Sequence, residues 1–310
     1  MSASTPKPPS ATNVLLDPFA LARLARDSVS AWLDDFAPSM GAAISYYTVF
    51  SIAPLMLIVI AMAGVFLGAD AASGRVFAEL EGLMGAEGAN AIQAMVKSAS
   101  DPERSTFGTV IGIVTLLVGA TTVFAELQSA LDRIWRAPAA AKSEGIVALL
   151  RARLLSFGLI LAVGFLLLVS LVVSVALSAL GTWWAPYFGG WQTLLQGANL
   201  VISIIIITLL FAFIYKWLPR VRIGWRDVWI GAAVTGVLFT AGKFLIGLYI
   251  GKSGIVSGFG AAGSLVVVLI WVYYSAQIFL LGAEFTWLYA YRYGSRRGQD
   301  SPPPMVRRKG

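Results

Sequence analysis

Residues 251–264, "GKSGIVSGFGAAGS", carry two patterns that phosphate-binding proteins use. A Gly-Lys-Ser triplet opens the stretch, and a G-x-G-x-x-G pattern begins at Gly258, with Glu284 about where a ribose-binding carboxylate would stand. A phosphate loop, however, needs Gly at position 246, which is Ile246. A dinucleotide fold needs a strand before the pattern and a helix and strand after it, whereas one long apolar stretch follows here. We therefore expect no nucleotide and no cofactor.

The same glycines predict a hinge. G-x-x-x-G pairs begin at Gly247 and Gly254, and such pairs allow helix backbones to approach closely. They also permit a tight or re-entrant turn that is buried in protein at membrane depth. The predicted hinge residues are Gly251, Gly254, Gly258, Gly260 and Gly263.

Lys243 is an ionisable residue inside an apolar segment, where charge is costly and often functional. Its small and polar neighbours at helical spacing predict a face that packs against another helix, so that Lys243 points into a bundle. These neighbours are Gly236, Thr240 and Gly247. The alternative is a structural lysine that bonds a carbonyl group or extends toward the membrane surface.

Glu284 is the second such residue. Gln277 and Tyr273 precede it by 7 and 11 residues, which places the three on one helical stripe about 16 Å long. The stripe predicts a polar path, with a carboxylate anchored by an arginine as the alternative. Lys243 and Glu284 are expected to miss one another in depth by several Å.

Glu126 ends another apolar segment, at a predicted depth similar to that of Glu284. Asp132 and Arg136 follow it at i and i+4, which predicts an ion pair on one helix. The arginines that could pair with Glu126 or Glu284 are Arg133, Arg151 and Arg153. A structural network at the inner face is the alternative to a functional role.

The first apolar segment carries hydroxyl groups in its inner half, among them Ser51, and then Pro54. Proline removes a helix hydrogen bond and bends the helix. A bend beside hydroxyl groups is typical of transport sites, although plain helical bundles contain it too.

Six apolar segments must position these residues, each with the roughly 20 residues that an α-helix needs to cross a membrane. They cover about 41–68, 108–127, 154–181, 198–217, 228–250 and 264–290. The chain is 58% hydrophobic and 13% charged, whereas soluble domains contain about 25% charged residues. We predict an all-α, polytopic membrane bundle of six transmembrane helices, with residues 38–292 as the membrane domain.

The distribution of Lys and Arg predicts the orientation. Of the 23 such residues, 18 lie before the first span, after the second, after the fourth or after the sixth, and four lie on the other side. Because cytoplasmic loops are enriched in these residues, both ends of the chain are expected in the cytoplasm. The net charge of +7 then fits anionic lipids rather than nucleic acid, since the sequence has no basic-aromatic module.

Residues 15–37 predict an amphipathic helix with Asp17 as N-cap and Pro18 at its first position. It lies along the cytoplasmic membrane interface or packs on the bundle. Polar, Pro-rich residues 1–14 and the basic residues 293–310 are expected to be disordered tails.

Residues 69–107 predict an outer helical hairpin, split near Gly85 and Gly88. The hairpin either caps the bundle, which we favour, or contacts a partner.

Four motifs together resemble the YihY / virulence factor BrkB family of bacterial inner-membrane proteins. They are "AAISYYTVFSIAPLMLI" at 42–58, "LDRIWR" at 131–136, "YKWLP" at 215–219 and "GAAGSLVVVLIWVYYSAQIFLLGAEFTWLYA", which ends at residue 290. The resemblance implies a location in the bacterial cytoplasmic membrane but no established reaction. Members have carried the label ribonuclease BN, which the sequence argues against: the chain has no His, no Cys and no cytoplasmic catalytic domain to hold metal ligands.

We therefore expect a membrane protein without enzymatic activity, most simply a transporter or flippase-like protein for an amphipathic or anionic molecule or lipid. The alternative is an envelope scaffold that binds partners through the outer hairpin and the amphipathic helix. An intramembrane enzyme acting on lipid is least favoured, because no nucleophile–base pair can be proposed. A homo-oligomer is compatible with the sequence, which leaves the substrate and its energy source open.

Overall fold

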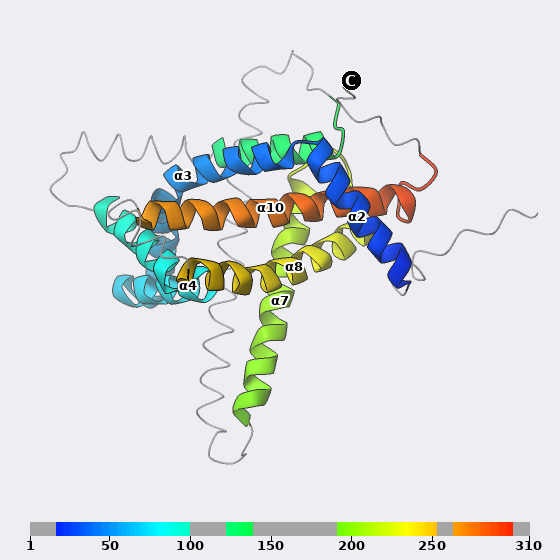
Figure 1. The fold of residues 1–310 in the computed structure, drawn as a ribbon. Coiled ribbons are helices and arrows are strands. Elements are labelled where there is room, and N and C mark those ends of the chain that lie inside the picture. The colour runs from blue at the N-terminus through cyan, green and yellow to red at the C-terminus, as the bar shows by residue number, and fades with distance from the viewer. Residues whose placement is uncertain (1–16, 100–121, 139–190, 253–262, 300–310) are drawn as a thin grey trace, which may run out of the picture.

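The computed structural model describes residues 17–99, 122–138, 191–252 and 263–299, in which every regular element is a helix. In chain order they are α2 (Pro18–Asp34), α3 (Ala37–Leu67), α4 (Ala69–Ala99), a helix at 122–134, α7 (Trp191–Trp217), α8 (Trp225–Lys252) and α10 (Gly263–Arg292). α3, α10 and α8 run side by side (Figure 1). α2 crosses one end of α10, α4 packs near the other end, and α7 crosses α8. The predicted all-helical fold is confirmed for these residues.

Three of these helices are long and apolar enough to cross a membrane, at Leu200–Trp217, Trp225–Ile250 and Leu265–Arg292. α3 is a fourth candidate, in which the segments Ala37–Ala53 and Leu55–Val65 meet at 45°. These helices coincide with four of the six predicted spans. The predicted spans at 108–127 and 154–181 lie largely or wholly outside the described residues, so the count of six stays a prediction.

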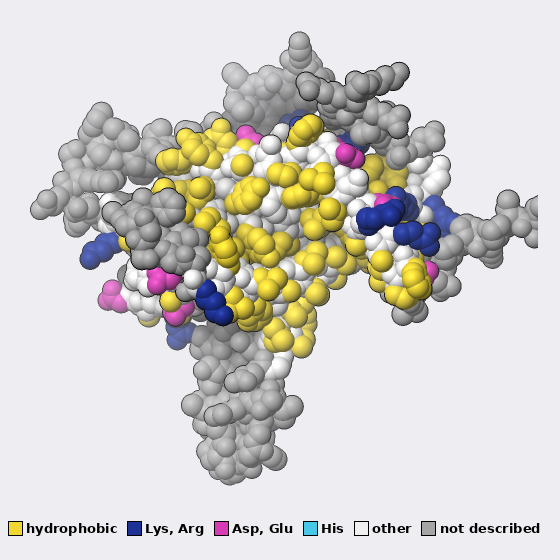
Figure 2. Space-filling view, in the orientation of Figure 1, with side chains coloured by type: hydrophobic (Ala, Val, Ile, Leu, Met, Phe, Trp, Pro, Cys, Tyr) yellow, Lys and Arg dark blue, Asp and Glu magenta, His cyan; other side chains and the backbone are white. Residues whose placement is uncertain are grey.

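The surface agrees with a membrane bundle. Hydrophobic side chains cover the face formed by α3, α10 and α8 (Figure 2). Charged side chains gather instead near α4 at one end and near α2 and the end of α10 at the other. An apolar band between charged ends is the pattern that lipid tails and headgroups select.

α2 begins as predicted. The Asp17 side chain accepts a hydrogen bond from the Phe19 N–H at 3.0 Å, with Pro18 at the first helical position. Leu24 is buried against the bundle, whereas Val29 and Leu33 remain exposed. The helix therefore packs mainly on α10 and keeps an apolar face outward. Its position at a membrane interface stays a prediction.

α4 breaks at Gly85, the position predicted for the split. Gly85 has φ 81° and ψ 168°, a conformation that only glycine adopts readily. Met84, Ile92 and Val96 of α4 are buried with residues of α3 and of the N-terminal half of α10. α4 thus covers one end of the helix pair, as the cap interpretation requires.

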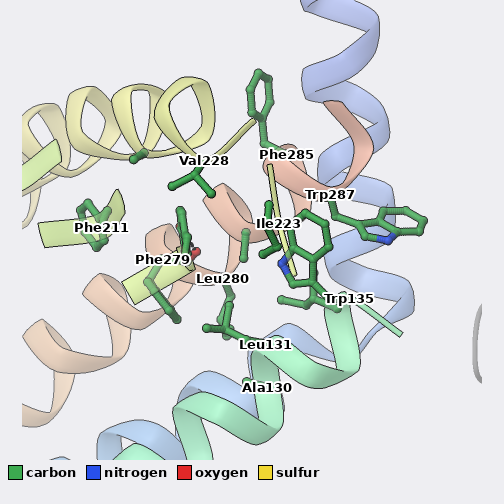
Figure 3. Packing of buried hydrophobic residues seen from close by; sticks show 14 of the residues in the cluster. Ala130, Leu131, Trp135, Phe211, Ile223, Val228, Phe279, Leu280, Phe285 and Trp287 are labelled. Carbon is green, nitrogen blue, oxygen red and sulfur yellow. Dashed lines mark hydrogen bonds between the residues drawn. The ribbon is translucent and has the colours of Figure 1, made fainter. Parts of the chain in front are cut away.

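The main core surrounds the C-terminal half of α10. Leu131 and Trp135 face Phe279 and Leu280 of α10, and Val228 of α8 lies beside them (Figure 3). Because these side chains come from helices distant in the sequence, the core joins the short helix at 122–134 to the span bundle.

Small residues let α8 and α10 approach closely. A Cβ atom at Gly231 of α8 would clash with Thr286, and one at Gly282 of α10 would clash with Thr235. Thr235 also hydrogen-bonds the Gly231 carbonyl oxygen at 2.7 Å. Such contacts are typical of helix packing in membranes, where small residues allow backbones to come together.

Candidate functional site

Glu284 lies in the C-terminal half of α10 with no exposed surface. Neither of its carboxyl oxygens has a hydrogen-bond donor among the described residues. Its electrostatic neighbours are Asp35 and Arg136, and then Asp34. A buried ionisable group in a candidate span is costly and therefore marks this place as a candidate site.

Asp35 and Arg136 form a buried ion pair next to Glu284. The Arg136 Nη1 donates to both carboxylate oxygens of Asp35 at 2.6 Å, and the two side chains are only 5% and 2% exposed. The guanidinium group also lies 5.2 Å from the centre of the Trp287 ring. The pair connects the α2–α3 junction and the end of the helix at 122–134 with α10, which supplies Glu284 and Trp287.

The backbone conformation at Arg136 directs its side chain toward Asp35. Its φ of 52° is left-handed, and the N–H groups of Arg136 and Ala137 donate to the carbonyls of Arg133 and Asp132. This is the arrangement in which a helix usually ends on glycine. A residue with a side chain costs about 1–2 kcal/mol in that conformation, so the site holds Arg136 against a local preference.

The predicted ion pair between Asp132 and Arg136 is wrong. Asp132 instead accepts the Arg220 N–H at 2.8 Å and lies 3.3 Å from the Arg220 Nε, while Arg136 pairs with Asp35. The physical reason is that the helix ends before Arg136, so the i and i+4 side chains no longer share a face. Burial raises the pKa of Asp132 more than its contacts with Arg220 lower it.

Of the three arginines predicted as partners of Glu126 or Glu284, the structure describes only Arg133. Arg133 stacks over the Phe36 ring at 5.6 Å, and Arg151 and Arg153 fall outside the described residues. Glu126 is half-buried on the helix at 122–134. Asp35 and Arg136, the groups that do approach Glu284, were not predicted to do so.

The stripe predicted along α10 changes in burial along its length. Tyr273 is 37% exposed, Gln277 is half-buried and Glu284 is buried. Gln277 contacts α3, where a Cβ atom on Gly41 would clash with its amide, and its Oε1 has no donor among the described groups. That these three residues line one polar path stays a prediction.

The hydroxyl groups of α3 bond within their own helix. Ser45, Thr48 and Ser51 donate to the carbonyls four residues earlier at 2.7–2.8 Å. The two segments of α3 meet at Pro54, which confirms the predicted bend.

Lys243 is half-buried on α8, and its ammonium group lies 5.4 Å from the centre of the Phe244 ring. It borders an apolar pocket with Phe239, Trp271 and Ile278, in which the side chains leave no space for a water molecule. On its predicted helix-packing face, Gly236 meets Thr208 of α7. No atom of the described helices lies within 4 Å of a Cβ placed on Gly247, so the expected close approach is absent there.

The predicted hinge is described only at its edges. Gly251 belongs to the end of α8, and Gly263 is the first residue of α10. Gly254, Gly258 and Gly260 lie outside the described residues, so the hinge stays a prediction.

A second buried carboxylate, Asp227, joins two helix ends. It lies at the start of α8 and accepts hydrogen bonds from the Ser295 N–H at 3.1–3.2 Å and from the Ser295 hydroxyl at 2.5 Å. The carboxylate of Asp227 thus accepts hydrogen bonds on both oxygens, whereas that of Glu284 accepts none from the described residues. Asp227 therefore connects the start of α8 to the residues that follow α10 and has a structural role.

The family described as "Virulence factor BrkB" matches residues 28–306, which include Asp35, Arg136 and Glu284. A UPF0761 membrane protein of Pseudomonas aeruginosa (strain LESB58) is 29% identical over 262 residues, 84% of this chain and 61% of that protein. A UPF0761 membrane protein of Azotobacter vinelandii is 27% identical over 294 residues, 90% of this chain and 67% of that protein. The UPF0761 membrane protein YihY of Escherichia coli O1:K1 is 31% identical over 183 residues, 57% of this chain and 58% of that protein.

This chain thus spans about three fifths of the length of the Pseudomonas relative. No solved structure matches it. Because the family match covers most of the chain, and because helices able to span a membrane carry the candidate site, this membrane protein belongs to the family described as Virulence factor BrkB.

Proposed function

We propose that this protein moves an amphipathic or anionic small molecule or a lipid across the bacterial cytoplasmic membrane. In this proposal the chain crosses the membrane six times and has both ends in the cytoplasm. No catalytic step is included, since the relatives are named only as membrane proteins.

The observation that carries the proposal is Glu284. A carboxyl group that is buried in a span and has no described hydrogen-bond donor does not stabilise the fold by itself. Groups of this kind in membrane helices commonly belong to substrate or ion pathways. Asp227 shows the contrast, because both of its carboxylate oxygens accept hydrogen bonds from Ser295.

Two further features support movement across the membrane. α3 packs along α10 and is bent by 45° at Pro54, a device that lets one helix change shape beside a fixed partner. Lys243 places a half-buried positive charge on a second span, where an anionic headgroup could meet it.

A lipid-scrambling assay tests the proposal. The full chain is reconstituted into vesicles with fluorescent phosphatidylglycerol or phosphatidylcholine, and dithionite quenches the probe that reaches the outer leaflet. We expect faster and more complete quenching with the protein than in empty vesicles, and slower quenching with Glu284→Gln and Lys243→Ala. Glu81→Gln, on the exposed side of α4, is the matched control.

Unchanged flux in both variants would remove Glu284 and Lys243 from the mechanism. If wild-type protein moved neither lipid, flux of soluble organic anions from loaded vesicles would decide between a small-molecule transporter and no transport at all.

The alternative function is a scaffold, favoured by the position of α4 at one end of the bundle, with Glu81 and Glu87 exposed. Photo-crosslinkers placed over residues 71–98 should then capture one defined envelope protein. Absence of a defined product, together with intact flux, would count against the scaffold.

A further inference from the structure

The cluster at Asp35, Arg136 and Glu284 contains two carboxyl groups and one cation. Asp35 uses both of its oxygens on the Arg136 Nη1, at 2.6 Å each. Asp35 and Glu284 are almost fully buried, and so is the Arg136 side chain. If both carboxyls were ionised, one negative charge would remain uncompensated in an apolar surrounding, which is strongly unfavourable.

The Glu284 carboxyl group has no described hydrogen-bond donor, although it lies near Asp35 and Arg136. Asp35 is among the charged neighbours of Glu284, yet neither Glu284 oxygen receives a hydrogen bond from the described residues. Ionised carboxylates only accept hydrogen bonds, whereas a protonated one also donates. One proton would therefore supply both the missing charge and the missing donor.

The other charged groups near the cluster are exposed, ion-paired or stacked on a ring. Asp34 is exposed beside Asp35. Arg133 lies over the Phe36 ring, its buried Nε has no hydrogen-bond partner among the described residues, and it is not among the charged groups that influence Glu284. Asp132 is paired with Arg220, and Asp27 with Arg292. The apolar walls come from α10, the helix at 122–134 and their neighbours, and Trp287 covers the guanidinium group.

We propose that Asp35 and Glu284 form a proton-binding site, in which one proton is shared by the two carboxyl groups and Arg136 balances the remaining negative charge. The site joins the start of α3 to α10. Gain or loss of this proton therefore changes the strength of the contact between α10 and the junction of α2 and α3. A metal ion would need more oxygen ligands than these two carboxyls supply. The proposal goes beyond transport and holds whether or not the protein moves a substrate.

Infrared spectroscopy of the purified full chain in detergent tests the site. A protonated carboxyl group shows a C=O stretching band that shifts in D₂O. Exposed carboxyl groups have pKa values of about 4, so they are ionised at neutral pH and do not contribute to this band there. We expect wild-type protein to keep such a band at neutral pH, and Glu284→Gln to lose it. Glu81→Gln, which alters an exposed carboxyl, should keep the band.

The charge count gives two sharper expectations. Asp35→Asn leaves one carboxylate and one guanidinium, which balance without a proton, so the band should also vanish. Arg136→Met leaves two carboxyls and no cation, so the band should grow. Far-ultraviolet circular dichroism identifies any variant that fails to fold. If Arg136→Met does not fold, the infrared spectra of wild-type protein, Glu284→Gln and Asp35→Asn still test whether these two carboxyl groups bind the proton.

A wild-type protein without the band at neutral pH would overturn the proposal. So would a band that persists in both Glu284→Gln and Asp35→Asn, because the proton would then lie elsewhere. Loss of the band on adding NaCl at constant pH would assign the site to a metal cation instead. A scrambling assay that failed while the band behaved as expected would reject the proposed transport and leave the proton site standing.

Discussion

Glu284 and Lys243 are both ionisable residues within spans, on neighbouring helices, but their surroundings differ. Glu284 has no exposed surface and lies against a buried ion pair from two other elements. Lys243 is half-buried, rests on the ring of Phe244 and borders a pocket with no space for water. The first group is enclosed by charged partners, and the second lies at an apolar edge.

The difference teaches that a charge inside an apolar segment is not a site by itself. A lysine has a long apolar stem and can place its ammonium group at the edge of a bundle at modest cost. A buried glutamate has no such escape and depends on partners that distant parts of the chain must supply. Burial and partners therefore separate the two residues more clearly than sequence position does.

Arg136→Met gives the largest expected effect. It leaves Asp35 and Glu284 buried without their cation, which should cost about 3–5 kcal/mol of stability. Thermal melting of the purified protein in detergent measures the loss. The neutral triple variant, with Asp35→Asn and Glu284→Gln added, should recover most of it, because replacing a complete buried set is far less costly than breaking it. A triple variant as unstable as Arg136→Met would show that the charges are not the cause.

Gly282→Ala should have the next largest effect. The new methyl group clashes with Thr235 and with the Tyr215 hydroxyl, and overpacking of this kind costs about 1–3 kcal/mol. Gly247→Ala on α8 is the matched control, since no described atom lies near its Cβ position. Melting temperatures that fall equally in both variants would contradict the tight packing of the Glu284 end.

Asp27→Asn tests a partly exposed ion pair against the buried one. Arg292 bonds Asp27 at 2.6 Å and holds the pKa of its carboxyl below the usual value. The stabilisation is therefore present above pH of about 4 and disappears as the pH falls through the lowered pKa. At neutral pH the variant should be less stable by at most about 1 kcal/mol, and the two melting curves should converge in acid. A difference that widened in acid would reverse the assigned sign.

Lys243→Met should change stability least, by about 0.5 kcal/mol or less, because it keeps the apolar stem and removes a charge that is only half-buried and has no ion-pair partner among the described residues. The same melting assay measures it. A loss comparable to that of Arg136→Met would remove the distinction between the two regions.

Local signals predicted much of the fold. Asp17 and Pro18 start α2, Gly85 breaks α4 and Pro54 bends α3, and each effect depends on a few neighbouring residues. The three candidate spans, and bent α3 as a fourth, follow from length and apolar composition alone.

The partners of Glu284 could not be predicted in the same way. Asp35 lies at the end of a helix whose polar residues suggested exposure, and the left-handed turn at Phe36 follows it, with φ 58°. Arg136 stood at helical spacing from Asp132, but its own left-handed backbone ends that helix. Asp35 and Arg136 are 101 residues apart in the sequence, and both approach Glu284 only in the folded chain, for which the local pattern carries no signal.

The glycine contacts of α10 have a mechanical consequence. Gly231 and Gly282 lock α8 to α10 through two threonines, so neither helix can rotate or slide without a collision. α3 meets α10 at Gly41 through the flexible amide of Gln277 and is bent at Pro54. We therefore expect α8 and α10 to move together as one rigid body in any large motion of the described helices, and α3 to move relative to them.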